Sequence, residues 1–547
     1  MFNLNFKNPV VITLFVFILV LTHFSGTITG DEEKVFNFID SFLRSNQTII
    51  TWLTNPLNDC EIWPKCHSSF LKHNFGWFFV NIFFLKISQY LFFFYQDFLS
   101  NRILIEICLS FINCLCFWLA FVILFKKYNK ENGFALTLAT IIIFVYGSYL
   151  NNLSAGGYIE AILILILSIR ICFLEKKELK TYEIIFVSIL DAILISLRFF
   201  YFWAVIIFLI INFINLKDKK QIKYILFFLI PIIILSVFYF LQGTITAKAY
   251  LNTNELKDIN FLEYYFIKIT RSFCEVSLID IAKIYLNRLY LSFFSFSVGI
   301  VFIFPVIFLT FNSLKNKVFL FKLLILLGFI FAFSLEQNFY LPAGISGHRG
   351  LAPLLIIFFP EVLKGIKYLS LNNKRFIFMI VLSFLIILFT PSLYFRSTLA
   401  HYTIFTKNVY KNVETNNENN LVLGLEKNIP RCYKDESFSH SSIQMHPGIF
   451  GWKFLISREL KMNETTIDSK NGKKLISLDD FPPQTLFHRI NHLIIYNFKN
   501  YENNILKKIF NQNTKLILIF KLIYYLSLLL LFACPVILFN YFFKKIR

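Results

Sequence analysis

The chain has 547 residues, of which 56% are hydrophobic and 19% aromatic, and its formal net charge is +21. A soluble protein of this size needs a larger polar surface, so the composition excludes an ordinary soluble domain. The apolar residues recur in runs of about 17–25 residues, the length that crosses roughly 30 Å of hydrocarbon, which predicts an all-α polytopic membrane protein.

The positive charge is concentrated in short loops between the apolar runs, among them "KKYNKEN", "EKKELK" and "KDKKQIK". This distribution is typical of loops that stay on the cytoplasmic side of a membrane. The net charge therefore indicates topology and gives no reason to expect a nucleic-acid partner. Some of these side chains can also attract anionic lipid headgroups.

The first apolar run, residues 9–27, is predicted to be a span that is retained as an uncleaved signal anchor. Lys7 is the only charge before it, and no convincing small-x-small cleavage site precedes the acids that follow. The loop after it contains Cys60 and Cys66, which form a disulfide if the loop faces an oxidising compartment and otherwise stay reduced.

The next apolar segment, residues 75–95, decides the orientation of everything after it. If it crossed the membrane, the three basic loops quoted above would lie outside, against the charge rule. We therefore predict an amphipathic helix that lies in the membrane interface with its aromatic face toward lipid.

About twelve spans with both termini in the cytoplasm follow from this choice. After residues 9–27, the predicted spans are 102–125, 134–150, 156–174, 182–197, 199–216, 222–241, 289–312, 317–334, 350–368, 374–393 and 515–542. The large outer segments are then 28–101, 242–288 and 394–514.

The outer segment 394–514 is predicted to be a small α/β domain held between the last two spans. "NLVLGL" and "HLIIYNF" are typical of short buried strands, whereas "VETNNENN" and "DSKNGKK" are typical of loops. The chain thus divides into a transmembrane module, 1–393, this domain, and a final span with a basic tail, 515–547.

Several polar residues fall together on the outer face, although only the basic loops were used to set the topology. They are Asp31, Glu32, Glu33, Lys72, His73, Glu160, Arg198, His348 and Arg349. This convergence predicts one outward-facing polar site.

Each of these residues also has a simpler interpretation. Asp31 and Glu33 can cap or charge the first turn of a helix over "EKVFNFIDSFL", and Glu160 can cap the span it begins. Lys72 and His73 can be interfacial anchors.

The arginines differ in how well a simpler interpretation accounts for them. Arg349 can snorkel to the interface. Arg198 is harder to explain this way, because a lone guanidinium between two apolar segments is costly unless it is paired or in water. Asp191, seven residues before it, is a candidate partner.

The combination of cations and carboxylates at a membrane boundary suits chemistry on a lipid-linked phosphate. Arginine and lysine bind phosphate through charge-assisted contacts, and arginine can do so with two parallel hydrogen bonds. A neighbouring carboxylate can take a proton from an acceptor hydroxyl or help to place a metal ion.

In the order of these motifs the chain resembles GT-C fold glycosyltransferases, more narrowly the bacterial dolichyl-phosphate-mannose–protein mannosyltransferase and lipid A aminoarabinose transferase group. The matching segments are "TGDEEKVF", "FLKHNFGWFFV", "NNLSAGGYIEAILILIL", "LISLRFFYF" and "GHRGLAPLLIIF". His73 and Asn74 replace the family's prolines, and Gly350 stands where an aromatic residue is usual. The resemblance covers most of 1–370, and the span after the outer domain departs from it.

The resemblance implies a role for each matching residue. Asp31 would be the catalytic base, supported by Glu32. Lys72, Arg198 and Arg349 would bind the donor phosphate, with His73, Glu160 and His348 as secondary site residues. The resemblance gives no certain cofactor, and a divalent cation at the acids stays open.

The implied enzyme is a hexosyl- or pentosyltransferase. It would move a monosaccharide from a polyprenyl-phosphate donor to a glycolipid, polysaccharide or protein acceptor, on the outer face of a bacterial inner membrane. Leaving-group stabilisation by fixed cations would be its main electrostatic contribution.

Two other functions remain open from the sequence. An O-antigen polymerase or ligase also has many spans and a large late outer loop, but it does not require the acids after the first span. A lipid-linked sugar flippase or transporter would place acids and broken helices at mid-membrane, where only Asp191 is found, and no two-fold repeat is visible.

Overall fold

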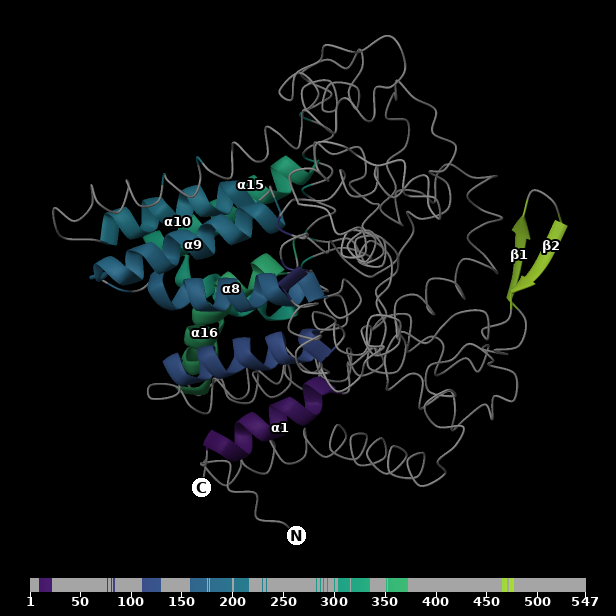
Figure 1. Cartoon of the computed structure of the whole chain (residues 1–547), viewed down its shortest axis with the longest axis horizontal. Helices are drawn as coiled ribbons and strands as arrows, with labels where there is room; N and C mark the ends of the chain where they lie inside the picture. Colours follow the sequence, from purple (N-terminus) through teal and green to yellow (C-terminus); the bar gives the residue numbers. More distant parts are fainter. Residues whose placement is uncertain are drawn as a thin grey trace.

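The computed structural model describes a subset of the chain, and the statements below refer to it. The described residues are 9–21, 76, 80, 82–83, 111–128, 158–174, 176, 178–198, 201–215, 229, 233, 282, 286, 289, 293, 300, 304–314, 316–334, 351, 353–371, 465–469 and 472–476. Most of them belong to helices that lie side by side in one group (Figure 1).

Helix α1, Pro9–Leu21, packs against the helix Phe111–Tyr128. Proline suits the first position of a helix, because the N–H that it lacks would have no partner inside the helix. The indole Nε1 of Trp118 donates a hydrogen bond of 2.9 Å to the carbonyl of Thr13. Phe17 meets the same indole edge to face, with ring centroids 5.4 Å apart.

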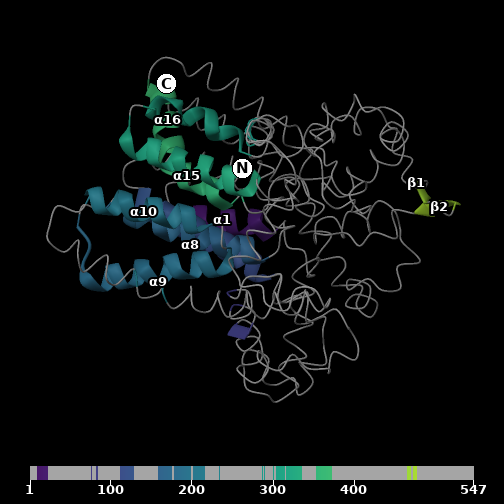
Figure 2. The same ribbon diagram turned by 90° about the horizontal axis from the view of Figure 1, so that it is seen from above.

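Helices α8, Tyr158–Leu174, α9, Thr181–Leu197, and α10, Tyr201–Asn215, are consecutive and contact one another. Figures 1 and 2 both show them running side by side. Their bounds agree with the expected helical segments 156–174, 182–197 and 199–216 within two residues.

The turn between α8 and α9 is basic and is held by Glu183. Lys176 Nζ donates to Glu183 Oε1 at 2.6 Å, and the backbone N–H of Lys180 donates to Glu183 Oε2 at 3.0 Å. The second contact satisfies an N–H at the helix start, as in a capping box. This turn is the predicted cytoplasmic end of the pair of helices.

We call α8, α9 and α10 the first group of helices. The second group contains α15, Lys317–Ser334, and α16, Phe359–Leu371, each preceded by a 3-10 segment. The two 3-10 segments are η2, Pro305–Ser313, and η3, Pro353–Phe358. Helix α15 matches its predicted segment, whereas the end of 289–312 is a 3-10 helix and α16 continues three residues beyond the predicted 350–368.

The two groups meet where α10 packs on α15. Trp203 Nε1 donates to the carbonyl of Leu324 at 3.1 Å, and a Cβ added to Gly328 would lie 1.6 Å from that nitrogen. Gly328 therefore leaves the space that the indole occupies. Helix α8 also contacts η3, and Tyr128 stacks near Phe359, so the groups form one bundle.

Replacing Gly328 with alanine is expected to destabilise the bundle by about 1–3 kcal/mol, the usual cost of overpacking. Unfolding of the purified protein by SDS titration measures this. Trp203→Phe in the same chain removes the obstructing nitrogen and should recover part of the loss. Wild-type stability for Gly328→Ala alone would contradict the close approach.

An ion pair lies inside the second group. Lys322 Nζ on α15 is 2.9 Å from both carboxylate oxygens of Glu361 on α16, and both side chains are 1% exposed. Sequence reasoning missed this pair, which joins residues 39 positions apart.

Lys322→Met is expected to cost about 3–5 kcal/mol, because it leaves the Glu361 carboxylate buried without its cation. The double replacement Lys322→Met, Glu361→Leu should recover most of this, since it removes both charges together. Unfolding of the two variants in SDS tests the difference. Equal losses in both would contradict the pairing.

In the predicted outer domain, the described residues form one antiparallel hairpin. Strand β1, Thr465–Ser469, pairs with β2, Gly472–Ile476, in the register Thr465↔Ile476. The prediction of a loop over "DSKNGKK" is therefore wrong at its two ends, because Asp468–Ser469 and Gly472–Lys474 belong to the strands. Asp, Ser, Asn and Gly favour turns, so a stretch that contains all four is typical of a loop over its whole length. "NLVLGL" and "HLIIYNF" lie outside the described residues.

By length and apolar composition, one helix within the described ranges could cross a membrane, Phe111–Tyr128, and Tyr201–Ile214 is a shorter apolar helix. The number of spans, the interfacial position of 75–95 and the two-sided topology stay predictions. Gly76, Val80, Ile82 and Phe83 are helical, as that segment requires at these positions.

Candidate functional site

Arg198 lies at the tip of the α9–α10 hairpin. Helix α9 ends at Leu197, and Arg198 has extended backbone angles, φ −148° and ψ 110°, while its N–H still bonds the carbonyl of Leu194. The N–H of Tyr201 then bonds the Arg198 carbonyl at 2.9 Å and begins α10. The short connection places a guanidinium between two apolar helices.

The guanidinium of Arg198 is paired with Glu160 at the start of α8. Arg198 Nη2 donates to Glu160 Oε1. The Glu160 side chain is fully buried, whereas that of Arg198 is 24% exposed. Glu160 lies in the first turn of α8, where the helix dipole also favours a negative charge. The Glu160 carboxylate is thus stabilised both by the Arg198 guanidinium and by the helix dipole, and part of the Arg198 side chain remains exposed to solvent.

Tyr201 completes this cluster, which we call the tip cluster and define as Glu160, Arg198 and Tyr201. Its side chain is fully buried, lies close enough to both charged residues to interact electrostatically, and packs edge to face on Phe329 of α15. The tip cluster is therefore held in place by four helices: α8 carries Glu160, α9 ends just before Arg198, α10 begins with Tyr201, and α15 packs on Tyr201 through Phe329.

Gly76, from the segment predicted to be the first outer one, lies beside the tip cluster. A Cβ added to Gly76 would lie 2.4 Å from Ser196 Oγ and 2.6 Å from the Ser196 carbonyl carbon, so only glycine permits this approach. Ser196 is two residues before Arg198. Lys72 and His73, a few residues before Gly76, lie outside the described residues.

The segment after Arg349 also reaches α8. Leu351 is buried, its carbonyl accepts the N–H of Leu354 at 3.0 Å, and η3 contacts α8. His348 and Arg349 themselves lie outside the described residues, as do Asp31, Glu32 and Glu33. Of the predicted site residues, the structure therefore brings together Glu160 and Arg198, and the positions of the other named residues remain predictions.

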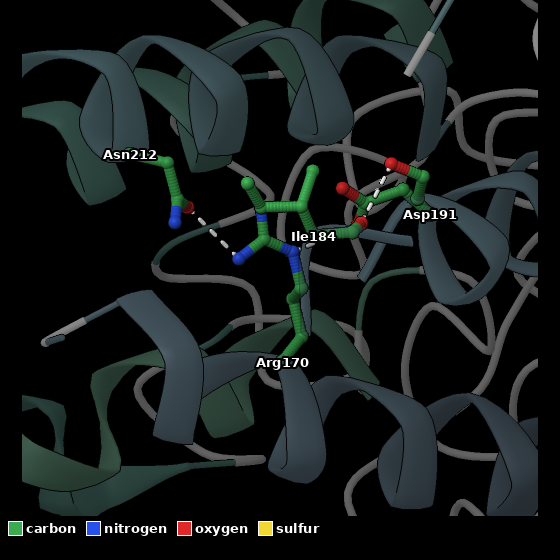
Figure 3. A network of polar contacts seen from close by, with 5 residues as sticks. Arg170, Ile184, Asp191 and Asn212 are labelled. Carbon is green, nitrogen blue, oxygen red and sulfur yellow. Dashed lines mark hydrogen bonds and ion pairs between the residues drawn. The ribbon is translucent and has the colours of Figure 1, made fainter. Parts of the chain in front are cut away.

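The expected pairing of Asp191 with Arg198 is wrong. Asp191 bonds Arg170, a residue that sequence reasoning did not single out, and Arg198 bonds Glu160 (Figure 3 shows the first pair). Arg170 Nε lies 2.8 Å from Asp191 Oδ1, and Arg170 Nη1 donates to Asn212 Oδ1 at 2.9 Å. We call Arg170, Asp191 and Asn212 the inner cluster.

The statement that only Asp191 is deep in an apolar segment is corrected by the same contacts. Arg170, Lys322 and Glu361 are also buried in helices. The signal was present in "LSIRICFL" and "VFLFKLLIL", where a single cation interrupts an apolar run. Such a residue needs a partner, whose identity depends on which helices are neighbours.

Metal ligands and thiols add little to the site within the described residues. No group of three or more His, Cys, Asp or Glu side chains that could hold a metal ion occurs there. Cys114, Cys116 and Cys172 are free thiols. Cys60 and Cys66 lie outside the described residues, and so do the acids considered for a divalent cation.

Comparison with known proteins found no matching family model, no matching curated protein and no matching solved structure.

Proposed function

We propose that the chain is an integral-membrane glycosyltransferase of the GT-C type, which moves a monosaccharide from a polyprenyl-phosphate donor to an acceptor on the outer face. The observation that carries the proposal is the tip cluster, with Gly76 packed on Ser196 beside it. A partly exposed arginine, oriented by a buried carboxylate, follows two residues after the point where the segment containing Gly76 meets α9. This is a suitable environment for a phosphate at a membrane boundary.

In the proposed reaction, Asp31 takes the proton of the acceptor hydroxyl, and the hydroxyl oxygen bonds to the anomeric carbon of the sugar. The bond from this carbon to the phosphate oxygen breaks, and its electron pair stays on the phosphate. Arg198, with Lys72 and Arg349, stabilises that charge. Attack opposite the leaving phosphate gives inversion at the anomeric carbon.

Glu160 acts in this proposal through Arg198. A fully buried carboxylate that lost its arginine would remain as an uncompensated buried charge, so exchange of Glu160 for phosphate is disfavoured. The guanidinium has five N–H donors and can serve both anions. Glu160 is therefore a positioning residue that fixes one edge of the guanidinium.

Mass analysis of glycolipids and glycoproteins from cells with and without the gene tests the proposal. Loss of one sugar from one acceptor class is expected, with recovery on expression of the wild-type chain. Unchanged glycans would contradict it. The lost sugar would also identify the donor and the acceptor class together.

A flippase or transporter of lipid-linked sugars is the second candidate function, and the buried charges favour it. Arg170, Asp191, Lys322 and Glu361 lie within helices, which is common along transport pathways. Movement of a lipid-linked sugar between leaflets of sealed vesicles, with no new glycosidic bond, would support this candidate over the first.

A further inference from the structure

The inner cluster joins three consecutive helices through one side chain. Arg170 on α8 bonds Asp191 on α9 and Asn212 on α10, and its guanidinium carbon lies 5.1 Å from the ring centre of Phe208. Arg170 and Asp191 are fully buried, and Asn212 is buried as well. The carboxylate, the amide and the ring together satisfy a cation that would otherwise be very costly in this interior.

Both helices of the hairpin link the inner cluster to the tip cluster. On α10, Tyr201 and Asn212 are eleven residues apart, close to three turns of helix, so they lie on one face. On α9, Asp191 lies six residues before the last helical residue, Leu197, and Arg198 follows directly with extended backbone angles. The hydrogen bonds of the inner cluster therefore fix how far the α9–α10 hairpin lies along α8 and how its helices are rotated, and both determine where the tip of the hairpin lies.

The charges in the two clusters run in opposite order. On α8, Glu160 is negative and Arg170 positive, whereas on α9 their partners are Arg198 and Asp191. A parallel arrangement of the two helices would set Arg170 against Arg198. Apolar packing between helices gives little preference for one register in lipid, so paired charges can specify it.

We propose that Arg170, Asp191 and Asn212 are positioning residues that hold the α9–α10 hairpin so that its tip presents Arg198 to a lipid phosphate. The inference rests on the proposed function of Arg198. The inner cluster would then contribute to phosphate binding from a distance. Arg170 lies ten residues after Glu160 on α8, about 15 Å from the tip cluster that would bind the phosphate.

Binding of octyl phosphate to the purified full-length protein in nanodiscs tests this, with octanol as the uncharged comparison. Asn212→Leu keeps side-chain size but cannot accept from Arg170, and Arg170→Lys keeps the charge but loses the planar fork. Each is expected to lower the melting midpoint, because a buried donor loses its partner, and to weaken octyl phosphate binding by about 10- to 100-fold in protein that is still folded at the temperature of the assay, because small displacements of a binding group have effects of this size.

Asn113→Leu is the matched control, since Asn113 is also buried in a helix but lies in Phe111–Tyr128, outside the inner cluster. It should bind octyl phosphate like the wild type. Wild-type binding by a folded Asn212→Leu would overturn the inference, and so would equal weakening by Asn113→Leu. Should Arg170→Lys not fold, Asn212→Leu decides alone.

Arg198→Gln separates this inference from the proposed function. Loss of binding in Arg198→Gln together with wild-type binding in Asn212→Leu overturns the positioning role alone. Wild-type binding in Arg198→Gln overturns the assignment of the phosphate to Arg198 and, with it, the inference.

Discussion

Replacing Arg198 with glutamine is expected to lower sugar transfer by about 100- to 1,000-fold, the range seen when one fixed donor to a developing negative charge is removed. Glutamine keeps much of the side-chain length and a donor but loses the charge and the fork. Arg198 is proposed to contact the phosphate of the bound donor, so KM should rise, and because the charge on the departing phosphate grows during the reaction, kcat should fall as well. Transfer rates measured over a range of donor concentrations separate kcat from KM.

Glu160→Gln is the companion to this experiment. It leaves the Arg198 charge in place but removes the carboxylate that holds one edge of the guanidinium. Glu160→Gln is expected to lower the rate of sugar transfer less than Arg198→Gln does. Glu160→Asp, which keeps the carboxylate, is expected to be at least as active as Glu160→Gln. If Glu160→Gln were far more damaging than Arg198→Gln, the assignment of positioning to Glu160 and of phosphate binding to Arg198 would be reversed.

Replacing Asp31 with asparagine is expected to lower turnover by about 100- to 10,000-fold, the usual contribution of a general base. Asparagine has almost the same shape but cannot take the proton of the acceptor hydroxyl. Donor binding should change little, because the base acts on the acceptor. Single-turnover transfer and octyl phosphate binding, measured on one preparation, distinguish these two quantities.

Glu33→Gln is the matched control for Asp31→Asn, since Glu33 is expected only to charge the start of a helix. It should retain near wild-type turnover. Full activity of Asp31→Asn would remove the proposed base and would favour an O-antigen polymerase or ligase, which does not need an acid after the first span.

The helical segments could be predicted because their signals are local. The end of α9 follows from Arg198 between two apolar segments, and α15 has the bounds expected from one apolar run after a basic loop. Apolar length and the residues that interrupt it are properties of short stretches, so sequence alone was sufficient there.

The partners of the buried charges could not be predicted in the same way. Asp191 and Arg198 are seven residues apart in the sequence, a spacing that would place them on one face of a continuous helix and that suggested a pair. The actual partners, Arg170 and Glu160, come from the preceding helix, 21 and 38 residues away. Which faces of two helices meet depends on packing over the whole bundle, and no local pattern encodes it.

The hairpin β1–β2 in the segment predicted to be an outer domain shows a different limit. "DSKNGKK" contains turn-forming residues throughout, and this composition cannot distinguish a long loop from a tight turn with short strands. Pairing of β1 with β2 gives the backbone hydrogen bonds that such polar residues lack as a loop. Backbone pairing thus overrode the preference of the side chains.

Transfer in detergent tests the central claim most directly, because a detergent solution has no compartments in which transport could be mistaken for reaction. The purified chain would be mixed with a lipid extract and an acceptor fraction, both from cells lacking the gene. The proposed function predicts that the acceptor gains the mass of one sugar, and that Arg198→Gln abolishes most of the gain. Absence of any gain with folded wild-type protein, together with movement of lipid-linked sugar across sealed vesicles, would contradict it.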